Sequence, residues 1–328
     1  MLTLFRTNQL LFSVLLIFYA VALHLCVFVI PDDWTPRSAG FFSKLLYEWI
    51  GFKGILPDII AILLLFAHAI AINALAARHR LADVVTLFPG LFYLLVVSAL
   101  PEFLHLSPLH LANTFYLIVI FELMATYKQP SCADRIFNIG FWLAVGSLFY
   151  FSYLIFIIFG LIGMNTLRAF KLKEWLMMLS GAAVPYLLIG AYVFSTDGLE
   201  TFVQQQFAHN FGFWALISLE GIEGYFKLAF VGFLLLIVLL SYSLYVFKKN
   251  IQVQKKIGIL YYGLLFAIGT ALFQSGVQLD NLLVLAIPMG ILLAINFLSI
   301  SSRWAETLHL ILLFIVLFFQ YRAIVLPF

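Results

Sequence analysis

Charged residues are scarce in this chain, in which Asp, Glu, Lys and Arg together make up 10% of 328 residues. A soluble domain carries about 25% of such residues, and a chain so poor in charge cannot cover a water-facing surface. The formal net charge is only +3, and the cations are spread over many short segments, so the basic stripe of a nucleic-acid-binding protein is absent as well. We therefore expect neither a soluble globular protein nor a nucleic-acid partner.

Cysteine is almost absent too, since Cys26 and Cys132 lie in separate regions and no Cys-x-x-Cys occurs. A disulfide framework or a thiolate metal site needs more cysteines than this, so we expect two free thiols. The chain also lacks a P-loop, His-Glu-x-x-His, Gly-x-Ser-x-Gly and a dinucleotide-binding glycine pattern. An Arg-rich voltage-sensor helix and a pore-loop signature are missing as well. The common motifs therefore identify no activity.

Long apolar runs dominate what is present, because 64% of the residues are hydrophobic. Runs of about 20 apolar residues are typical of transmembrane helices, and the alternating polarity of barrel strands is absent. The predicted fold is an all-α, polytopic transmembrane helical bundle that forms a single integral-membrane domain over residues 1–328. We expect ten or eleven segments, at about 9–30, 55–76, 84–100, 110–127, 136–149, 151–166, 174–195, 225–246, 257–274, 282–299 and 304–322.

The charge pattern decides how the chain is threaded. Segments 136–149 and 151–166 are each short for a crossing, so this region could cross once or twice. Two crossings place most of the 18 Lys and Arg residues on one side, as the positive-inside rule requires of the cytoplasmic side. We therefore predict eleven segments in a bacterial inner membrane, with the N-terminus in the cytoplasm and the C-terminus in the periplasm.

Two of the predicted external loops are long. In the first, polar and apolar residues segregate at helical spacing over about 41–52, which predicts an amphipathic helix lying in the membrane interface with Trp34, Tyr47 and Trp49 at headgroup depth. The second covers about 196–224, and its second half, around 211–219, has an interfacial character as well.

The strongest candidates for chemistry lie in these external loops. Asp32 and Asp33 directly follow the first segment, and adjacent carboxylates could hold a divalent metal or act as a base. Glu102 and His105 are three residues apart and could share a proton on one side of a helical turn. The alternative for each is structural: a polar helix terminus, or a connector broken by prolines.

Other polar residues could bind a substrate or sit in the bundle. Gln205 and His209 belong to a polar run that could hydrogen-bond a sugar or a headgroup, although a solvated loop has the same pattern. His68 and Glu122 lie within segments, where an ionisable group is costly unless it has a partner. For His68 we expect a neutral imidazole packed in the bundle, and for Glu122 a position at the interface or a partner such as Lys128.

The chain resembles a family of bacterial inner-membrane proteins that carries only a domain-of-unknown-function label. The resemblance rests on MLTLFRTNQ, AHAIAINALAARHRL, LSPLHLANTF and RIFNIGFWLAVGSLFYF, and would cover nearly the whole chain. It implies a fold and a location and brings no established activity.

The layout also resembles the membrane module of GT-C glycosyltransferases, which take sugars from polyprenyl-phosphate donors. The shared features are acidic residues just after the first helix, an amphipathic helix in the same loop, a helix pair after a basic turn, and a late segment that begins Asp280-Asn281-Leu282. The chain has Asp-Asp where that family has Asp-Glu or Asp-x-Asp.

This resemblance implies roles for individual residues. Asp32 or Asp33 would activate the acceptor or hold a metal, and Glu102 would be a second acidic group, with His105 beside it. Arg37, Lys44 and Lys53 are the cations available in the first loop for a donor phosphate. The resemblance thus predicts a transferase for a lipid-linked sugar on the external face, with a polyprenyl-phosphate lipid as partner. A non-catalytic membrane subunit bound to a partner protein is the alternative, and a small-solute transporter is the third.

Overall fold

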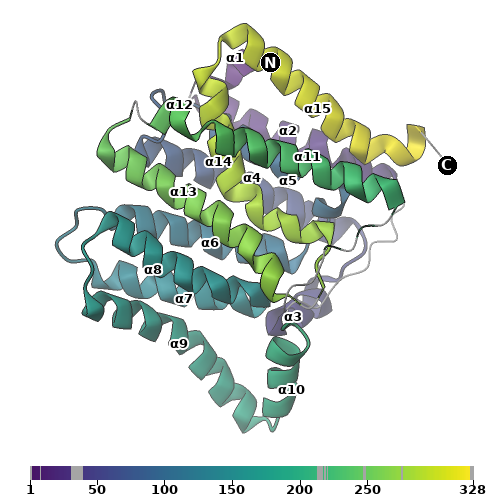
Figure 1. The fold of residues 1–328 in the computed structure, drawn as a ribbon. Coiled ribbons are helices and arrows are strands. Elements are labelled where there is room, and N and C mark those ends of the chain that lie inside the picture. The colour runs from purple at the N-terminus through teal and green to yellow at the C-terminus, as the bar shows by residue number, and fades with distance from the viewer. Residues whose placement is uncertain are drawn as a thin grey trace.

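The structure is a computed structural model that describes residues 2–7, 9–30, 40–212, 217, 219, 221–246, 249–274 and 276–325. Most of these residues are helical, and the only β-structure among them is two isolated bridges, Phe211 with Gln274 and Ile217 with Val277. The elements run α1 Leu2–Phe5, α2 Leu10–Val29, α3 Phe41–Ile50, α4 Ile55–His79, α5 Phe88–Val97, η1 Pro101–Phe103, α6 Pro108–Ala125, α7 Ala133–Phe149, η2 Phe151–Ile155, α8 Phe156–Leu167, α9 Leu172–Ser195, α10 Leu199–Val203, η3 Gln204–Ala208, α11 Gly221–Leu240, α12 Tyr242–Val246, α13 Ile251–Thr270, η4 Ala271–Phe273, η5 Leu279–Leu285, α14 Ala286–Ser299 and α15 Ser302–Val325 (Figure 1).

Eight helical segments are long and apolar enough to cross a membrane: Leu11–Val29, Ile55–His79, Pro108–Ala125, Leu172–Ser195, Gly221–Leu240, Ile251–Phe273, Leu279–Ser299 and Ser302–Arg322. Phe88–Val97 and Phe151–Leu167 are shorter apolar helices. The predicted all-α polytopic membrane bundle is therefore confirmed.

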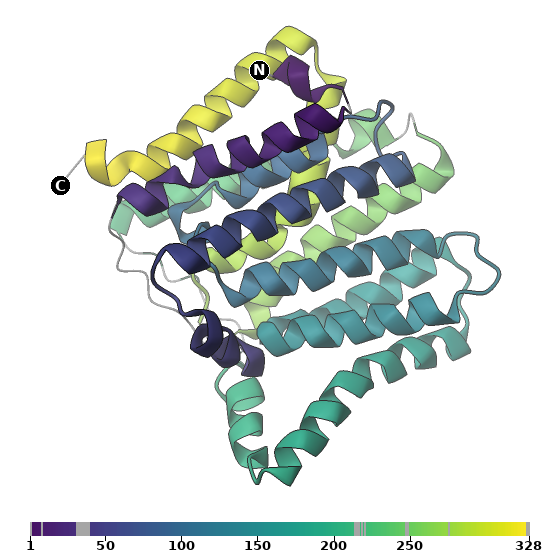
Figure 2. The same ribbon diagram turned by 180° about the vertical axis from the view of Figure 1, so that it is seen from behind.

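The long helices run back and forth, so the bundle has two ends (Figures 1 and 2). One end carries the start of α4 and of α11, η1, η5 and the last turn of α15; we call it the acidic end, since Asp58, Glu102, Glu223 and Asp280 lie there. The other end carries the last turn of α4, the connection from α6 to α7 and the start of α9 and of α13. We call it the basic end, after the Lys and Arg residues on these segments.

The region 136–166 folds back on itself as two antiparallel helices. α7 ends at Phe149, and the chain returns through η2 and α8, so that Gly160 of α8 packs against Leu143 of α7. Arg168, just after α8, lies at the basic end beside the end of α6. The helical hairpin that the charge pattern predicts is therefore present.

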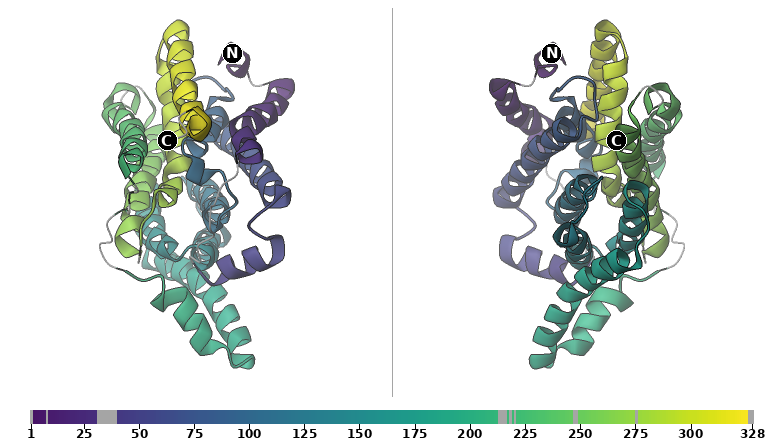
Figure 3. Two further views of the ribbon diagram at one scale, coloured as in Figure 1. Left: turned by 90° about the vertical axis from the view of Figure 1, so that its right-hand side faces the viewer. Right: turned by 90° about the vertical axis from the view of Figure 1, so that its left-hand side faces the viewer.

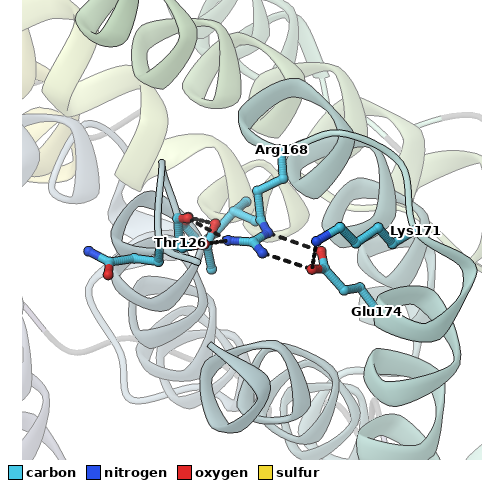
Figure 4. Close-up of polar contacts among 6 residues, drawn as sticks. Thr126, Arg168, Lys171 and Glu174 are labelled. Carbon is cyan, nitrogen blue, oxygen red and sulfur yellow. Dashed lines mark hydrogen bonds and ion pairs between the residues drawn. The ribbon is translucent and has the colours of Figure 1, made fainter. Parts of the chain in front are cut away.

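Arg168 fastens this hairpin to its neighbours (Figure 4). Its guanidinium donates to both carboxylate oxygens of Glu174 in α9, at 3.0 and 2.7 Å. It also donates to the backbone carbonyls of Thr126 and Gln129, at 3.0 and 2.5 Å. One side chain thus joins the segment that follows α6 and the end of α8 to the first turn of α9.

The centre of the bundle is formed by α5 and α14. Every residue of α5 is buried, and so are nearly all residues of α14. A Cβ atom on Gly290 of α14 would lie 2.6 Å from Cα of Tyr93 in α5. One turn earlier in α5, a Cβ on Gly90 would lie 2.5 Å from the carbonyl oxygen of Ala69 in α4. Glycine at these two positions lets the backbones approach closely, as small residues do in membrane helix packing.

The second half of α9 leaves the body of the bundle and meets α10 at an angle (Figures 1 and 3). Leu187, Leu188 and Tyr192 are exposed there, as expected for a surface that faces lipid. Gln206 ties the end of this excursion back to the bundle. Its Oε1 accepts a hydrogen bond from the backbone N–H of Phe41 in α3 at 2.7 Å, and its Nε2 donates to the carbonyl of Ser147 in α7 at 2.8 Å.

Candidate functional site

A cluster of four charged side chains lies at the acidic end. Lys227 of α11 donates to Glu102 of η1 at 2.6 Å and to Glu223, one turn earlier in α11, at 2.9 Å. Glu223 also pairs with Arg322 in the last turns of α15. Local sequence sets this geometry, because Pro101 starts the short helix that presents Glu102, and the four-residue spacing in α11 places Glu223 and Lys227 on one face.

The cluster is partly withdrawn from solvent. Lys227 is 8% exposed, and a charge at this depth is stable only if it is paired. Glu102 Oε1 takes part in the pair, whereas Glu102 Oε2 is shielded from solvent and accepts no hydrogen bond from any described residue. One oxygen of this carboxylate therefore has lone pairs free to accept a proton or a donor from a bound molecule.

His105 lies beside a carboxylate from another helix. Its Nδ1 is 3.6 Å from Oδ1 of Asp58, in the first turn of α4. Glu102 pairs with Lys227, and His105 lies beside Asp58. The proton sharing predicted between Glu102 and His105 stays a prediction. Both pairs lie at the acidic end, because η1 and the start of α6 follow one another there.

Buried histidines continue from this end into the bundle. His110 Nδ1 is 2.9 Å from Ser107 Oγ. His68 Nδ1 is 2.8 Å from the hydroxyl of Tyr93, and its Nε2 is 2.8 Å from Thr114 Oγ1. Both ring nitrogens of His68 are therefore satisfied, which fits the neutral packed imidazole that the sequence predicts for this position.

Helix α3 covers part of the acidic end. Its Tyr47 hydroxyl is within electrostatic range of Asp280 in η5. Burial raises the pKa of Tyr47, and the negative charge of Asp280 raises this pKa further. Trp49 of the same helix is 86% exposed. The interfacial position predicted for this helix stays a prediction.

Asp32, Asp33 and Arg37 lie outside the described residues. Helix α2 ends at Val29, and the next described segment begins at Gly40, just before α3. The roles predicted for these three residues, and for Trp34 in the same stretch, stay predictions.

The other predicted substrate-binding residues lie at the surface. Lys44 is exposed and pairs with Glu48 at 3.7 Å, one turn later in α3, and Lys53 is exposed. Gln205 is half-buried and His209 is exposed, while the neighbouring Gln206 is buried and holds α3 and α7. The structure therefore brings neither Lys44 nor Lys53 into the cluster around Glu102.

Lys227 and Arg322 are the cations that the sequence analysis did not single out. The signal was present, since each is an ionisable residue at the end of a long apolar segment, where a charge requires a partner. Glu122, also within a segment, pairs with Arg135 at 3.1 Å rather than with Lys128. For Glu122 the sequence therefore predicts correctly that a cationic partner exists, but it points to Lys128 and not to Arg135.

The described residues contain no group of three or more His, Cys, Asp or Glu side chains that could hold a metal ion. Cys26 and Cys132 are both buried and neither forms a disulfide bond. Burial raises the pKa of the Cys132 thiol. The chemistry that these residues offer is proton transfer at carboxylates and charge neutralisation by Lys227 and Arg322.

Comparison with known proteins gives one structural similarity. No family model matches the chain, and neither does any curated protein. Among solved structures, the fold is similar to that of ArnT from Cupriavidus metallidurans, solved bound to undecaprenyl phosphate, with a TM-score of 0.49 and 15% identity. The match covers 88% of this chain, and the chain spans just over half, 56%, of the length of that protein. The resemblance to a bacterial family of unknown function stays a prediction.

Proposed function

We propose that this integral membrane protein is a transferase that uses a polyprenyl-phosphate-linked sugar at the acidic end of its bundle. The observation that carries the proposal is the Glu102 cluster, in which a carboxylate with one unpartnered, shielded oxygen lies beside a buried lysine. Residues from η1, α11 and α15, far apart in the sequence, contribute to this cluster.

In the proposed reaction an acceptor hydroxyl attacks the anomeric carbon of the donor sugar. The acceptor O–H bond breaks, and its proton passes to a carboxylate, for which Glu102 Oε2 is the described candidate and Asp32 or Asp33 the alternative. The bond between the anomeric carbon and the phosphate oxygen breaks, and polyprenyl phosphate leaves with the bonding electrons. Lys227 and Arg322 neutralise the charge that develops on this phosphate.

The charges of the cluster support this assignment. Two carboxylates and two cations balance in the absence of substrate. A bound phosphate would accept hydrogen bonds that Lys227 and Arg322 otherwise donate to Glu102 and Glu223. The carboxylate oxygens released in this way could then act as bases. Predicted placement of α3 in the interface would hold the lipid chain beside the cluster.

The test is turnover by the full chain reconstituted in liposomes with a polyprenyl-phosphate-linked sugar, measured as release of polyprenyl phosphate. Glu102→Gln should lower the rate by about 100-fold or more, because a general base contributes at least that much. Glu200→Gln is the control, since Glu200 is an exposed carboxylate that accepts a hydrogen bond from Gln204, one turn later. Equal rates for wild type and Glu102→Gln would contradict the proposal and favour a non-catalytic membrane subunit.

A further inference from the structure

A second polar cluster lies at the basic end, far along α4 from Asp58. Lys256 of α13 is 4% exposed, and its Nζ is 2.9 Å from Nδ1 of His79 in the last turn of α4. Nζ of Lys256 also lies over the ring of Tyr127, 5.9 Å from its centroid, and Nζ of Lys128 lies 5.6 Å from the same centroid. Three segments, the ends of α4 and α6 and the first half of α13, therefore meet around one buried ammonium group.

This buried charge has no carboxylate partner among the described residues. Lys256, Arg78 and Lys128 form no ion pair with any residue that the structure describes. Arg78 adds a further positive charge close to Lys256 and His79. Asp83, four residues beyond His79, pairs with Lys249 instead. A buried cation surrounded by cations is costly, so the cluster lacks an anion.

The hydrogen bond between Lys256 and His79 decides which imidazole nitrogen carries the proton. An ammonium group can only donate, so Nδ1 of His79 accepts and the proton of the neutral imidazole is on Nε2. Nε2 of His79 is buried and has no hydrogen-bond partner, and His79 itself is 7% exposed. An unpaired N–H donor and an ammonium group with spare protons thus lie on adjacent side chains.

We propose that this cluster is a binding site for a phosphate-type oxyanion, with Lys256 and His79 Nε2 as its direct donors and Arg78 and Lys128 as attracting charges. A phosphate has several acceptor oxygens, which suits donors from two helices, and charge-assisted hydrogen bonds to it are strong. The dipole at the C-terminus of α4 favours a cation, but it supplies no acceptor to His79 Nε2. The phosphate is that of an anionic lipid headgroup or a free phosphate ion.

The position favours contact with the membrane surface. Lys256 is near the start of a span, and Arg78 and Lys128 are exposed. Basic pockets between helices near the cytoplasmic surface are typical sites for anionic lipid headgroups, and the charge pattern predicts that the basic end faces the cytoplasm. The site is independent of the transferase proposed at the acidic end.

The experiment compares thermal unfolding and native mass spectra of the delipidated full chain with three additions: phosphatidylglycerol, phosphatidylcholine, and inorganic phosphate against chloride at equal ionic strength. Wild type should gain stability with phosphatidylglycerol but not phosphatidylcholine if the source is a lipid, and with inorganic phosphate if the source is the free ion. Lys256→Met should lower the apparent affinity for whichever anion stabilises the wild type by about tenfold or more. Lys255→Met, the same change one residue earlier on a half-buried lysine, should leave affinity unchanged.

A second readout separates binding from a structural role. Without added anion, Lys256→Met should be at least as stable as wild type, because it removes an uncompensated buried charge. If this variant does not fold, the surface variants Arg78→Gln and Lys128→Gln should each weaken anion binding and its dependence on salt. The proposal is overturned if neither anion stabilises the wild type, or if Lys256→Met and wild type respond equally.

Discussion

Glu102 and Lys227 are 125 positions apart in the chain, and their side chains meet at 2.6 Å. This contact joins the short helix η1, which follows the central helix α5, to the first turns of α11. Glu102 comes from a predicted external loop, and Lys227 lies near the start of an apolar span. We expect both the proposed activity and the stability of the acidic end to depend on this pairing.

Removing the cation alone should destabilise the protein. Lys227→Met leaves Glu102 and Glu223 facing each other, and we expect a loss of about 2 kcal/mol, below the range for fully buried pairs because the carboxylates are partly exposed. The double variant Lys227→Met/Glu102→Gln should recover most of the loss. Thermal unfolding in detergent measures both, and a double variant less stable than Lys227→Met would show that the pair is not the cause.

The guanidinium of Arg168 should not be replaceable by an ammonium group. Arg168→Lys loses the bidentate contact to Glu174 and the bonds to two carbonyls. We expect a loss of about 2 kcal/mol. Lys171→Met is the control. The Lys171 side chain is 58% exposed and makes only a 3.7 Å contact to the same carboxylate, so its loss should change stability by less than about 0.5 kcal/mol. Equal melting temperatures for the wild type and Arg168→Lys would disprove the role.

Close packing of α5 on α14 should make Gly290 intolerant of a side chain. In Gly290→Ala the new methyl group would press on the backbone of Tyr93, at a cost of about 1–3 kcal/mol for overpacking. Gly232→Ala is the matched control, because a Cβ there meets nothing within 4 Å and alanine favours a helix by about 1 kcal/mol. The melting temperatures of the two variants should move in opposite directions, and a shared direction would refute the packing argument.

Gln206 should hold α3 in place, whereas Gln205 should not. Gln206→Met leaves the backbone N–H of Phe41 without its acceptor, a loss of about 1–3 kcal/mol, while Gln205→Met removes a half-buried side chain. Hydrogen exchange over Phe41–Ile50 should accelerate in Gln206→Met alone. Similar exchange in both variants would mean that other contacts hold the helix.

The order of helices could be predicted because most apolar runs are long and most of the gaps between them are short. The basic residues around 128–135 and 168–173 also predicted that 136–166 doubles back, as α7 and α8 do. Irregular geometry was missed: the expected helix 225–246 is divided at Ser241 into α11 and α12, and the expected helix 282–299 begins as the 3₁₀ turn η5. Such breaks depend on local packing, which hydropathy does not encode.

The candidate site was predicted only in part. Glu102 and His105 were found because polar residues between apolar runs stand out, but their partners Lys227 and Asp58 come from other helices. Spacing along one chain segment predicts contacts within a helix turn and gives no information about which segments meet. For the same reason the sequence points to Lys44 and Lys53, which are close in sequence to the acidic pair, and not to Lys227 and Arg322, which belong to the cluster around Glu102.

The most direct test of the proposed site is an experimental structure of the full chain in lipid nanodiscs with added polyprenyl phosphate. We expect phosphate density within hydrogen-bonding distance of Lys227 Nζ or the Arg322 guanidinium, with Glu102 facing the same space. Polyprenyl phosphate bound elsewhere, with Lys227 still paired to Glu102 and Glu223, would contradict a transferase site at the acidic end.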